Sequence, residues 1–513
     1  MKSRHGIWWS ILLSMGLLAA VASPVTAAPK GRVVAALGSD TSTMDPHMHT
    51  ERVGIIINQH IFDTLLARDT KTWRPIPHLA ETITSVNPTT WELKLRRGVK
   101  FHNGEPFTAE SVKFTFERVL NPDQKSPIRG NFTWIKSVDV VDDHTVRLVT
   151  QKPYPLIQEI LTFGNFGMVP PKYIREKGDA HFARNPVGTG PFKFIEWRKG
   201  EQTTLEANDQ YWKGAPAIKT LVFRVIPETA TQIAELLSGG VDFIRAVPPD
   251  QIPAIKASGQ ARVTATKILR VAYLQMDGDA RAAKTPLTDV RVRRAVNHAV
   301  NVDEIMQKIL GGMAVRTPAG NNPMAFGFDP AIKPYALDPE RAKKLLAEAG
   351  FPNGFDIALN TYAGSIVNVD QVAQAVQGYL GKAGIRVKPR HFADVGQYLS
   401  NFRGSKLDGI TFASWGYNSV FDSDALYYIH FHKGEPYTYN SSPEMDQWLE
   451  DARATVDPRK RQELYSRLQR FIVDQAYWVP MYAQYTIEAV TNRLSYEASS
   501  DEIMRIHSAT WKQ

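Results

Sequence analysis

Residues 91–118 read WELKLRRGVKFHNGEPFTAESVKFTFER and carry the strongest structural signal in the chain. From Trp91 to Arg96 apolar and charged side chains alternate, which is typical of a half-buried strand. Asn103-Gly104 predicts a turn, because both residues accept a positive φ at little cost. Thr108 can cap a helix, and apolar residues after it recur at helical spacing on one face: Val112, Phe116, Val119 and Leu120. The run therefore predicts a strand, a hairpin turn and a helix in that order.

The same residues resemble the signature of the solute-binding proteins that serve peptide and nickel ABC importers. A second diagnostic run lies at residues 185–228, and the resemblance extends from about Val33 to Tyr485. It implies an α/β protein with the two-lobed periplasmic-binding-protein fold, in the large three-subdomain variant of type II. It also implies a ligand cleft between the two lobes.

The resemblance further implies how the chain is divided. One lobe, here called lobe I, has a core made of residues 28–68, 187–268 and 486–513. Residues 69–186 form a subdomain inserted into lobe I, and residues 269–485 form lobe II. The sequence itself favours α/β lobes, because helical and strand periodicities alternate beyond Thr229.

Several further elements are predicted from local patterns. Residues 31–38 are interpreted as a strand, residues 55–66 as a helix and residues 138–149 as a hairpin. Asp338-Pro339 and Asp457-Pro458 each predict an N-cap followed by a proline in the first helical turn. These two motifs should therefore open two helices in the second half of the chain.

The N-terminus predicts a secretory signal peptide over residues 1–27. Lys2 and Arg4 precede an apolar run from Ile7 to Ala22, and the small residues that follow suit cleavage before Ala28. The alternative is a membrane anchor, but sixteen mostly apolar residues fall short of the ~20 that span a bilayer. The chain has no Cys, so neither a disulfide nor a lipid-modified N-terminal Cys is available. An exported protein without a lipid anchor fits the Gram-negative periplasm best.

The charge pattern argues against nucleic acid as a partner. The formal net charge is +9, yet the basic residues are spread along the chain and form no block of five or six. The sequence also contains no nucleic-acid-binding motif. From the resemblance we expect a monomer with two partners, a peptide-like or other small solute and an inner-membrane ABC permease.

Motifs of catalysis are missing from the sequence. It contains no G-x-S-x-G elbow, no H-E-x-x-H, no phosphate loop and no dinucleotide-binding fingerprint. Gly188-Thr189-Gly190 has the wrong spacing for either nucleotide motif, and Pro191 follows at once, so we interpret it as the entry to a strand. We therefore expect no enzyme activity and no cofactor. The rival class is a secreted hydrolase that acts on the same solutes.

Two His-x-His pairs raise the question of a metal site, His47-Met48-His49 and His430-Phe431-His432. In an extended segment residues i and i+2 point the same way, so each pair could offer two imidazoles to a metal. Two nitrogens alone make an incomplete site. We therefore favour polar, hydrogen-bonded pairs and expect no bound metal.

Two segments supply the candidate ligand contacts. The family places contacts in the loop DPHMHTE, residues 45–51, which makes His49, Thr50 and Glu51 candidates. The segment ASWGYNSVFDSDALYYIHFH, residues 413–432, is rich in rings, which offer stacking area and a polar end. The resemblance places this second segment at the cleft, and its candidates are Trp415, Tyr417, Asn418 and Asp422.

The known ligand anchors of such receptors are missing here. Peptide binders typically carry an Asp three residues after the Trp, and this chain has the neutral Asn418 there. Asp422 and Asp424 are the acids that could serve a displaced amine. Residues 360–381 and 161–171, where relatives place basic residues for a peptide carboxylate or a nickel chelate, contain no Lys or Arg. We therefore expect a peptide-like ligand that is capped or neutral, or a ligand that is no peptide. The alternative is a nickel- or metal-chelate receptor of the same family.

Overall fold

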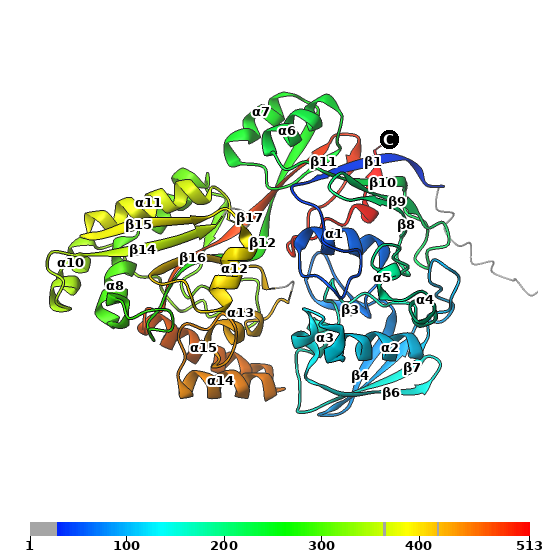
Figure 1. The fold of residues 1–513 in the computed structure, drawn as a ribbon, viewed down its shortest axis with the longest axis horizontal. Helices are drawn as coiled ribbons and strands as arrows, with labels where there is room; N and C mark the ends of the chain where they lie inside the picture. Colours follow the sequence, from blue (N-terminus) through cyan, green and yellow to red (C-terminus); the bar gives the residue numbers. More distant parts are fainter. Residues whose placement is uncertain (1–27, 363–365, 418–419, 513) are drawn as a thin grey trace, which may run out of the picture.

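The structure is a computed structural model that describes residues 28–362, 366–417 and 420–512. The predicted signal peptide and Asn418 lie outside these residues. Figure 1 shows two lobes side by side, joined by two long strands, β12 (Ala261–Met276) and β17 (Trp478–Thr491). The predicted α/β class is confirmed. The names lobe I, inserted subdomain and lobe II refer to the predicted residue ranges.

One continuous sheet runs through both lobes. Its strand order is β15-β14-β16-β12-β17-β11-β1-β10-β9-β8, and β13 (Ala314–Arg316) also pairs with β17. β12 and β17 are antiparallel, with register shifts that interrupt their ladder. β17 pairs with β11 (Phe243–Ile244) in lobe I, and β12 pairs with β16 (Ile410–Trp415) in lobe II. The two lobes therefore share one pair of strands.

Lobe I builds its part of this sheet around the predicted strand at residues 31–38, which is confirmed as β1 (Lys30–Leu37). Val33 and Ala35 pack in the core that includes α1, whereas Val34 and Ala36 pack in the core that includes α6 and α7. Alternate side chains of β1 thus face opposite layers. The other lobe I elements are β8 (Phe192–Arg198), β9 (Gln202–Ala207), β10 (Ile218–Val225), β18 (Leu494–Ser495), β19 (Thr510–Trp511), α1 (Arg52–Ile61), α6 (Thr229–Ser238) and α7 (Ile252–Ala257).

A helix was predicted at residues 55–66, and its predicted C-terminal end is wrong, because α1 stops at Ile61. Phe62 is already extended, with φ −119° and ψ 142°. The loop before β8 occupies the place of the next helical turn, since the Gly190 N–H donates to the Ile61 carbonyl at 2.9 Å. A Cβ at Gly188 would lie 2.1 Å from that carbonyl oxygen, so this close approach requires glycine. The interpretation of this loop as a strand entry is confirmed.

The inserted subdomain contains residues 91–118. The strand, turn and helix are confirmed: the turn has Gly104 at φ +88°, and the Thr108 N–H donates to Ser111 Oγ at 3.3 Å at the start of the helix. A four-stranded sheet of order β4-β5-β7-β6 packs against that helix. The elements are β2 (Leu66–Arg68), β3 (Pro75–Pro77), β4 (Ala80–Asn87), β5 (Thr90–Leu95), α2 (Ala109–Leu120), β6 (Ile135–Asp142), β7 (Thr145–Thr150), α3 (Ile157–Ile160), α4 (Pro171–Lys177) and α5 (Asp179–Phe182).

Lobe II covers its strands with helices. Both predicted N-caps are confirmed, because Asp338 accepts from the Arg341 N–H at 2.8 Å and Asp457 accepts from the Arg459 N–H at 2.9 Å. Its elements besides β13 and β16 are β14 (Phe355–Tyr362), β15 (Ile385–Phe392), α8 (Val290–Ala299), α9 (Val302–Glu304), α10 (Pro339–Glu348), α11 (Val369–Lys382), α12 (Val395–Arg403), α13 (Asp424–Phe431), α14 (Pro443–Ala454) and α15 (Pro458–Asp474).

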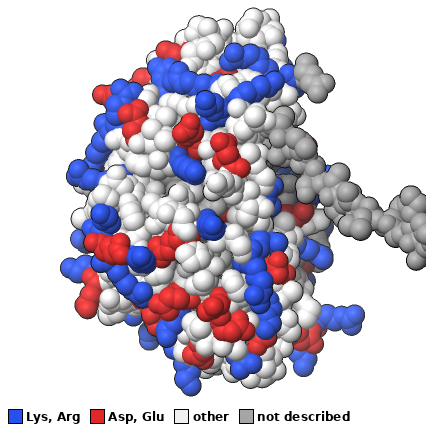
Figure 2. Space-filling view, turned by 90° about the vertical axis from the view of Figure 1, so that its right-hand side faces the viewer, with Lys and Arg blue, Asp and Glu red and all other residues white. Residues whose placement is uncertain are grey.

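The apolar cores of the parts are separate. One core lies within residues 269–483, a second within residues 65–168, and two more flank the lobe I sheet. On the face shown in Figure 2, acidic and basic side chains are interspersed. Within the part of the chain that the structure describes, none of the helices has the length and apolar character to cross a membrane.

Candidate functional site: a cleft between the inserted subdomain and lobe II

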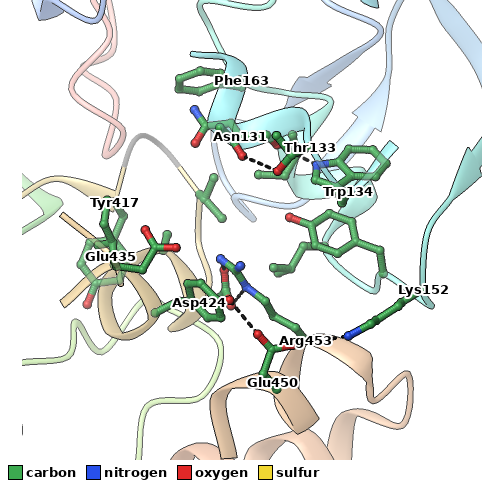
Figure 3. A pocket seen from close by; sticks show the side chains of 18 of the residues that line it. Asn131, Thr133, Trp134, Lys152, Phe163, Tyr417, Asp424, Glu435, Glu450 and Arg453 are labelled. Carbon is green, nitrogen blue, oxygen red and sulfur yellow. Dashed lines mark hydrogen bonds and ion pairs between the residues drawn. The ribbon is translucent and has the colours of Figure 1, made fainter. Parts of the chain in front are cut away.

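A cavity of about 660 Å³ separates the inserted subdomain from lobe II. Its volume is typical of a site for a small ligand. Figure 3 shows side chains from the two parts facing each other across this space. The inserted subdomain contributes Asn131, Thr133, Trp134, Lys152, Tyr154 and Phe163 among others, and lobe II contributes Trp415, Tyr417, Asp424, Tyr428, Glu435, Glu450 and Arg453.

The wall from the inserted subdomain presents a fixed aromatic surface. The rings of Trp134 and Tyr154 stack with their centroids 4.5 Å apart and their planes 17° from parallel. The Trp134 indole N–H donates to the Asn131 carbonyl at 2.7 Å, which holds the ring in place. Rings ordered before binding offer stacking area at little further entropic cost.

The opposite wall contains an ion pair between two helices. Arg453 of α14 donates to both carboxylate oxygens of Asp424 at the start of α13, at 2.7 and 2.9 Å. Burial lowers the pKa of Arg453, but the attraction of Asp424 outweighs it and the pKa is raised overall. The guanidinium also lies over the Tyr428 ring, 3.0 Å from its centroid. Arg453 is therefore charged and already neutralised by a partner.

A second charged contact joins the two walls. The Tyr428 hydroxyl donates to Glu450 at 2.7 Å, and Lys152 of the inserted subdomain lies 3.9 Å from the same carboxylate. Both partners of this Lys152–Glu450 pair are largely exposed, so it contributes little to stability. It shows that the walls approach within reach of long side chains.

Trp415 and Tyr417 lie in the lobe II wall. Trp415 ends β16, and its indole N–H donates to the Ala425 carbonyl at 2.6 Å. Tyr417 is fully buried; its hydroxyl donates to Asn321 Oδ1 at 2.6 Å and accepts from the Asn322 N–H at 2.9 Å. The half-buried Trp415 ring thus presents area to the cleft, whereas the Tyr417 hydroxyl is held by lobe II itself. Their contact with a ligand remains a prediction.

The structure does not bring His49, Thr50 and Glu51 into the lining of this cleft. His49 is buried, its Nε2 lies 2.8 Å from Asn58 Nδ2, and burial lowers its pKa. Glu51 is exposed before α1 and accepts from the Ser42 N–H at 3.3 Å. The first of these residues is thus held in lobe I by its own neighbours, and the ligand-binding role of all three stays a prediction.

Asp422 is likewise absent from the lining, although it precedes α13 by two residues. It is buried and binds Arg461 of α15 through two hydrogen bonds, one of them 2.8 Å long. The Tyr465 hydroxyl donates to it at 3.3 Å. We expected that Asp422 could bind a displaced ligand amine, but its carboxylate already has a structural partner in lobe II. Asn418 lies outside the described residues.

The His-x-His pairs have local partners. The premise of an extended segment is wrong for His430, which lies in helix α13, and its Nδ1 and Nε2 lie 2.7 Å from the Leu426 carbonyl and the Tyr273 hydroxyl. His47 Nε2 lies 3.0 Å from the Gly167 carbonyl. Burial lowers the pKa of both His47 and His430 to about 4. Across the described ranges, no three or more His, Cys, Asp or Glu side chains gather as metal ligands.

A second cavity, of about 520 Å³, lies inside lobe I between α1 and the C-terminal segment. Asp63 lines it and accepts hydrogen bonds from Thr189, Tyr211 and Trp212, each 2.9 Å long. This carboxylate is therefore satisfied by residues within lobe I.

Sequence reasoning missed the wall from the inserted subdomain and the acid–base pair across from it. Trp134 lies in the turn before β6 and Tyr154 in the loop after β7, and Arg453 lies on a helix in a chain with many basic residues. The only signal available was the aromatic content of the segments that flank β6 and β7. Their convergence on Trp415 depends on long-range packing, which local patterns do not encode.

Comparison with known proteins identifies the relatives of this architecture. Residues 74–438 match the family described as bacterial extracellular solute-binding proteins, family 5 middle region. The glutathione-binding protein GsiB of Pectobacterium atrosepticum is 28% identical over 502 residues, which cover 94% of each chain.

Two solved structures show the same fold. The periplasmic binding protein DppA of Helicobacter pylori, in complex with the peptide STSA, is 26% identical with a TM-score of 0.82, covering 94% of this chain and 98% of its own. The substrate-binding protein CtaP of Listeria monocytogenes gives a TM-score of 0.85 at 23% identity, covering 95% and 100%. The predicted two-lobed binding-protein fold is thereby confirmed.

Proposed function

The chain belongs to family 5 of the bacterial extracellular solute-binding proteins, and from this membership we propose how it captures and delivers its solute. It is the substrate-binding component of an ABC importer. We propose that its ligand is a small peptide-like solute. The names of two relatives support this class, since one is a glutathione-binding protein and the other was solved with a peptide.

The observation that carries the proposal is the cleft itself. It is a cavity of about 660 Å³ whose two walls come from different parts of the chain. One wall supplies the Trp134–Tyr154 stack, and the other supplies Trp415 and the Asp424–Arg453 pair. The surface of the cleft is mostly apolar and has a few fixed polar groups. It therefore suits a small solute that carries both apolar and polar groups.

Closure of the walls is the proposed means of capture. Lobe I and lobe II are joined through β12 and β17, so a bend in this strand pair would move one wall against the other. Trp73 of the inserted subdomain already stacks on Phe421 of lobe II, with centroids 5.5 Å apart and planes 3° from parallel. A ligand that contacts both walls selects the closed state, and docking to the permease favours the open one.

We further propose that no chemical step takes place in the cleft. Among the described residues that line it, none is a Ser, Cys or His. The protein would act as a monomer in the Gram-negative periplasm, after cleavage of residues 1–27 before Ala28. Intact mass of the exported protein tests the cleavage site, and a membrane-bound form that retains residue 1 would contradict it.

The test of the function is to identify the solute that the protein carries. Protein purified from the periplasm without refolding is denatured, and the released small molecules are identified by mass spectrometry. We expect one peptide-like solute in at most equimolar amount, returned unchanged after incubation with fresh protein. A cleaved product in excess over protein would instead support the hydrolase, and a nickel chelate would support the alternative receptor.

A further inference from the structure

Glu435 differs from the other acids of the cleft in its lack of a partner. Asp424 is bound by Arg453, and Glu450 accepts from the Tyr428 hydroxyl. The Glu435 carboxylate makes no hydrogen bond and no ion pair with any residue in the ranges 28–362, 366–417 and 420–512. It lines the cleft and is half-buried, so its charge is partly removed from water, and the nearby charges of Arg453 and His432 compensate for this only in part.

The position of Glu435 is fixed by its loop. Its backbone N–H donates to the His432 carbonyl at 3.2 Å, and its own carbonyl accepts from the Thr438 N–H at 3.3 Å. Pro436 follows and restricts the backbone further. Figure 3 shows Glu435 on the lobe II side, opposite the wall with Asn131 and Thr133. The carboxylate is thus held at the cleft by an ordered backbone.

The charge of Arg453 acts on Glu435 and lowers its pKa, but the Nε and one Nη of Arg453 donate their hydrogen bonds to Asp424. The described lining holds three acidic residues, Asp424, Glu435 and Glu450, and two basic ones, Lys152 and Arg453. The described lining therefore has an excess of one negative charge, and Glu435 is the acid of the three that has no hydrogen-bonded or ion-paired partner among the described residues. A cation in the ligand would restore the balance.

The surroundings of Glu435 suit an ammonium group. Trp415 lines the same wall with a half-buried ring, and aromatic faces attract cations. Burial raises the pKa of Glu435, and the charges of Arg453 and His432 offset this effect only in part. An ammonium ion at this place would reverse that effect and gain a charge-assisted hydrogen bond.

We propose that Glu435 binds an ammonium group of the ligand, and that the solute is therefore a peptide or peptide-like molecule with a free amine. This inference rests on the proposed function and deepens it by naming a chemical group of the solute. Glu435 would supply the carboxylate that peptide binders carry three residues after their Trp, where this chain has Asn418. The expectation of a capped or neutral ligand would then be replaced by that of a free amine.

The test compares a free amine with a blocked one. Calorimetry on the full mature protein uses the tetrapeptide Ser-Thr-Ser-Ala and its N-acetylated form as probes. We expect the wild type to bind the free peptide at least about tenfold more tightly than the acetylated one, since a charge-assisted hydrogen bond is lost. Glu435→Gln should abolish this preference by weakening only the free peptide. Glu340→Gln, an exposed acid on α10, is the matched control and should behave as the wild type.

A pH series separates a direct contact from a structural effect. Because the pKa of Glu435 is raised in the free protein and would fall on binding an ammonium, affinity for the free peptide should rise with pH through that pKa. This rise should be absent in Glu435→Gln. Equal binding of both peptides by wild type and Glu435→Gln would overturn the inference while the proposed function stands. If the wild type binds neither peptide, the carried solute and its N-acetylated form replace them as probes. A carried solute without a free amine would overturn the inference while the proposed function stands.

Discussion

Asp422 and Arg461 form a buried ion pair in lobe II, with two hydrogen bonds of which one is 2.8 Å long. Asp422 and Glu435 are separated by only 13 residues, yet their surroundings are opposite: one acid is paired in the core and the other is unpaired at the cleft. Charge alone therefore does not identify a ligand-binding acid in this chain. The presence or absence of a partner does.

The first prediction separates these two acids by stability. Asp422→Asn should lower the free energy of unfolding by about 3 kcal/mol, because it leaves the Arg461 guanidinium buried without its counter-ion. Glu435→Gln should change it by less than about 0.5 kcal/mol, since the carboxylate has no partner to lose. Urea denaturation of both variants measures the difference. Equal loss of stability in the two would contradict this assignment.

The second prediction concerns Trp415. Trp415→Ala should weaken binding of the solute by about 1–3 kcal/mol, because it removes a large ring from the cleft. Trp415→Phe should recover part of the loss, since it keeps a ring but loses the hydrogen bond to the Ala425 carbonyl. Calorimetry with the carried solute measures both, and Trp197→Ala in lobe I serves as the control. An unchanged affinity in Trp415→Ala would mean that the ring belongs to the packing of lobe II only.

The third prediction concerns closure of the cleft. The Trp73–Phe421 stack bridges the inserted subdomain and lobe II. Trp73→Ala should remove about 0.5–1.5 kcal/mol of stacking that favours the closed state. X-ray scattering of the ligand-free protein should then give a larger radius of gyration than the wild type. Identical scattering curves would show that this contact does not influence the distribution of open and closed forms.

The fourth prediction is a pH dependence of stability. Burial raises the pKa of Glu502, but Arg270, which donates two hydrogen bonds of 3.0 Å, and Arg52 outweigh it and lower the pKa from 4.5 to about 2. A depressed carboxyl pKa stabilises the folded state above 4.5, and this stabilisation is lost as the pH falls toward 2. The contribution is about 3 kcal/mol at neutral pH.

Glu502→Gln isolates that contribution. The variant should be less stable than the wild type at pH 7, and the gap should close between pH 4.5 and 2 as wild-type Glu502 becomes protonated. Chemical denaturation at a series of pH values measures the gap. A gap that stays constant over this range would contradict the role of the Arg270–Glu502 pair.

Local patterns predicted the elements whose signals are contained in a few residues. The strand, turn and helix of residues 91–118 and the caps at Asp338 and Asp457 follow from periodicity and capping chemistry, and the structure contains them. The predicted end of α1 was wrong. The loop Gly188–Gly190, which stops the helix, lies more than a hundred residues further along the chain. Its contact with Ile61 has no trace in the local sequence.

The candidate site was harder to predict from the sequence, because its contacts also join residues that are far apart in the chain. The partners that distinguish the acids are remote, since Arg461 lies 39 residues from Asp422 and Arg453 lies 29 residues from Asp424. Local patterns named Asp422 and Asp424 as candidates but missed Glu435, and they could not show which of these acids had a partner. The resemblance located Trp415 and Tyr417 near the cleft, whereas the opposite wall with Trp134 and Tyr154 became evident only from the packing.

The proposed function requires that the solute bind between the inserted subdomain and lobe II. A crystal structure of the protein with its carried solute would show where the solute lies. We predict electron density for one small solute between the Trp134–Tyr154 stack and Trp415, with an amine within hydrogen-bonding distance of Glu435. Density for the solute in the lobe I cavity beside Asp63, with only water in the cleft, would show that the cleft is not the binding site.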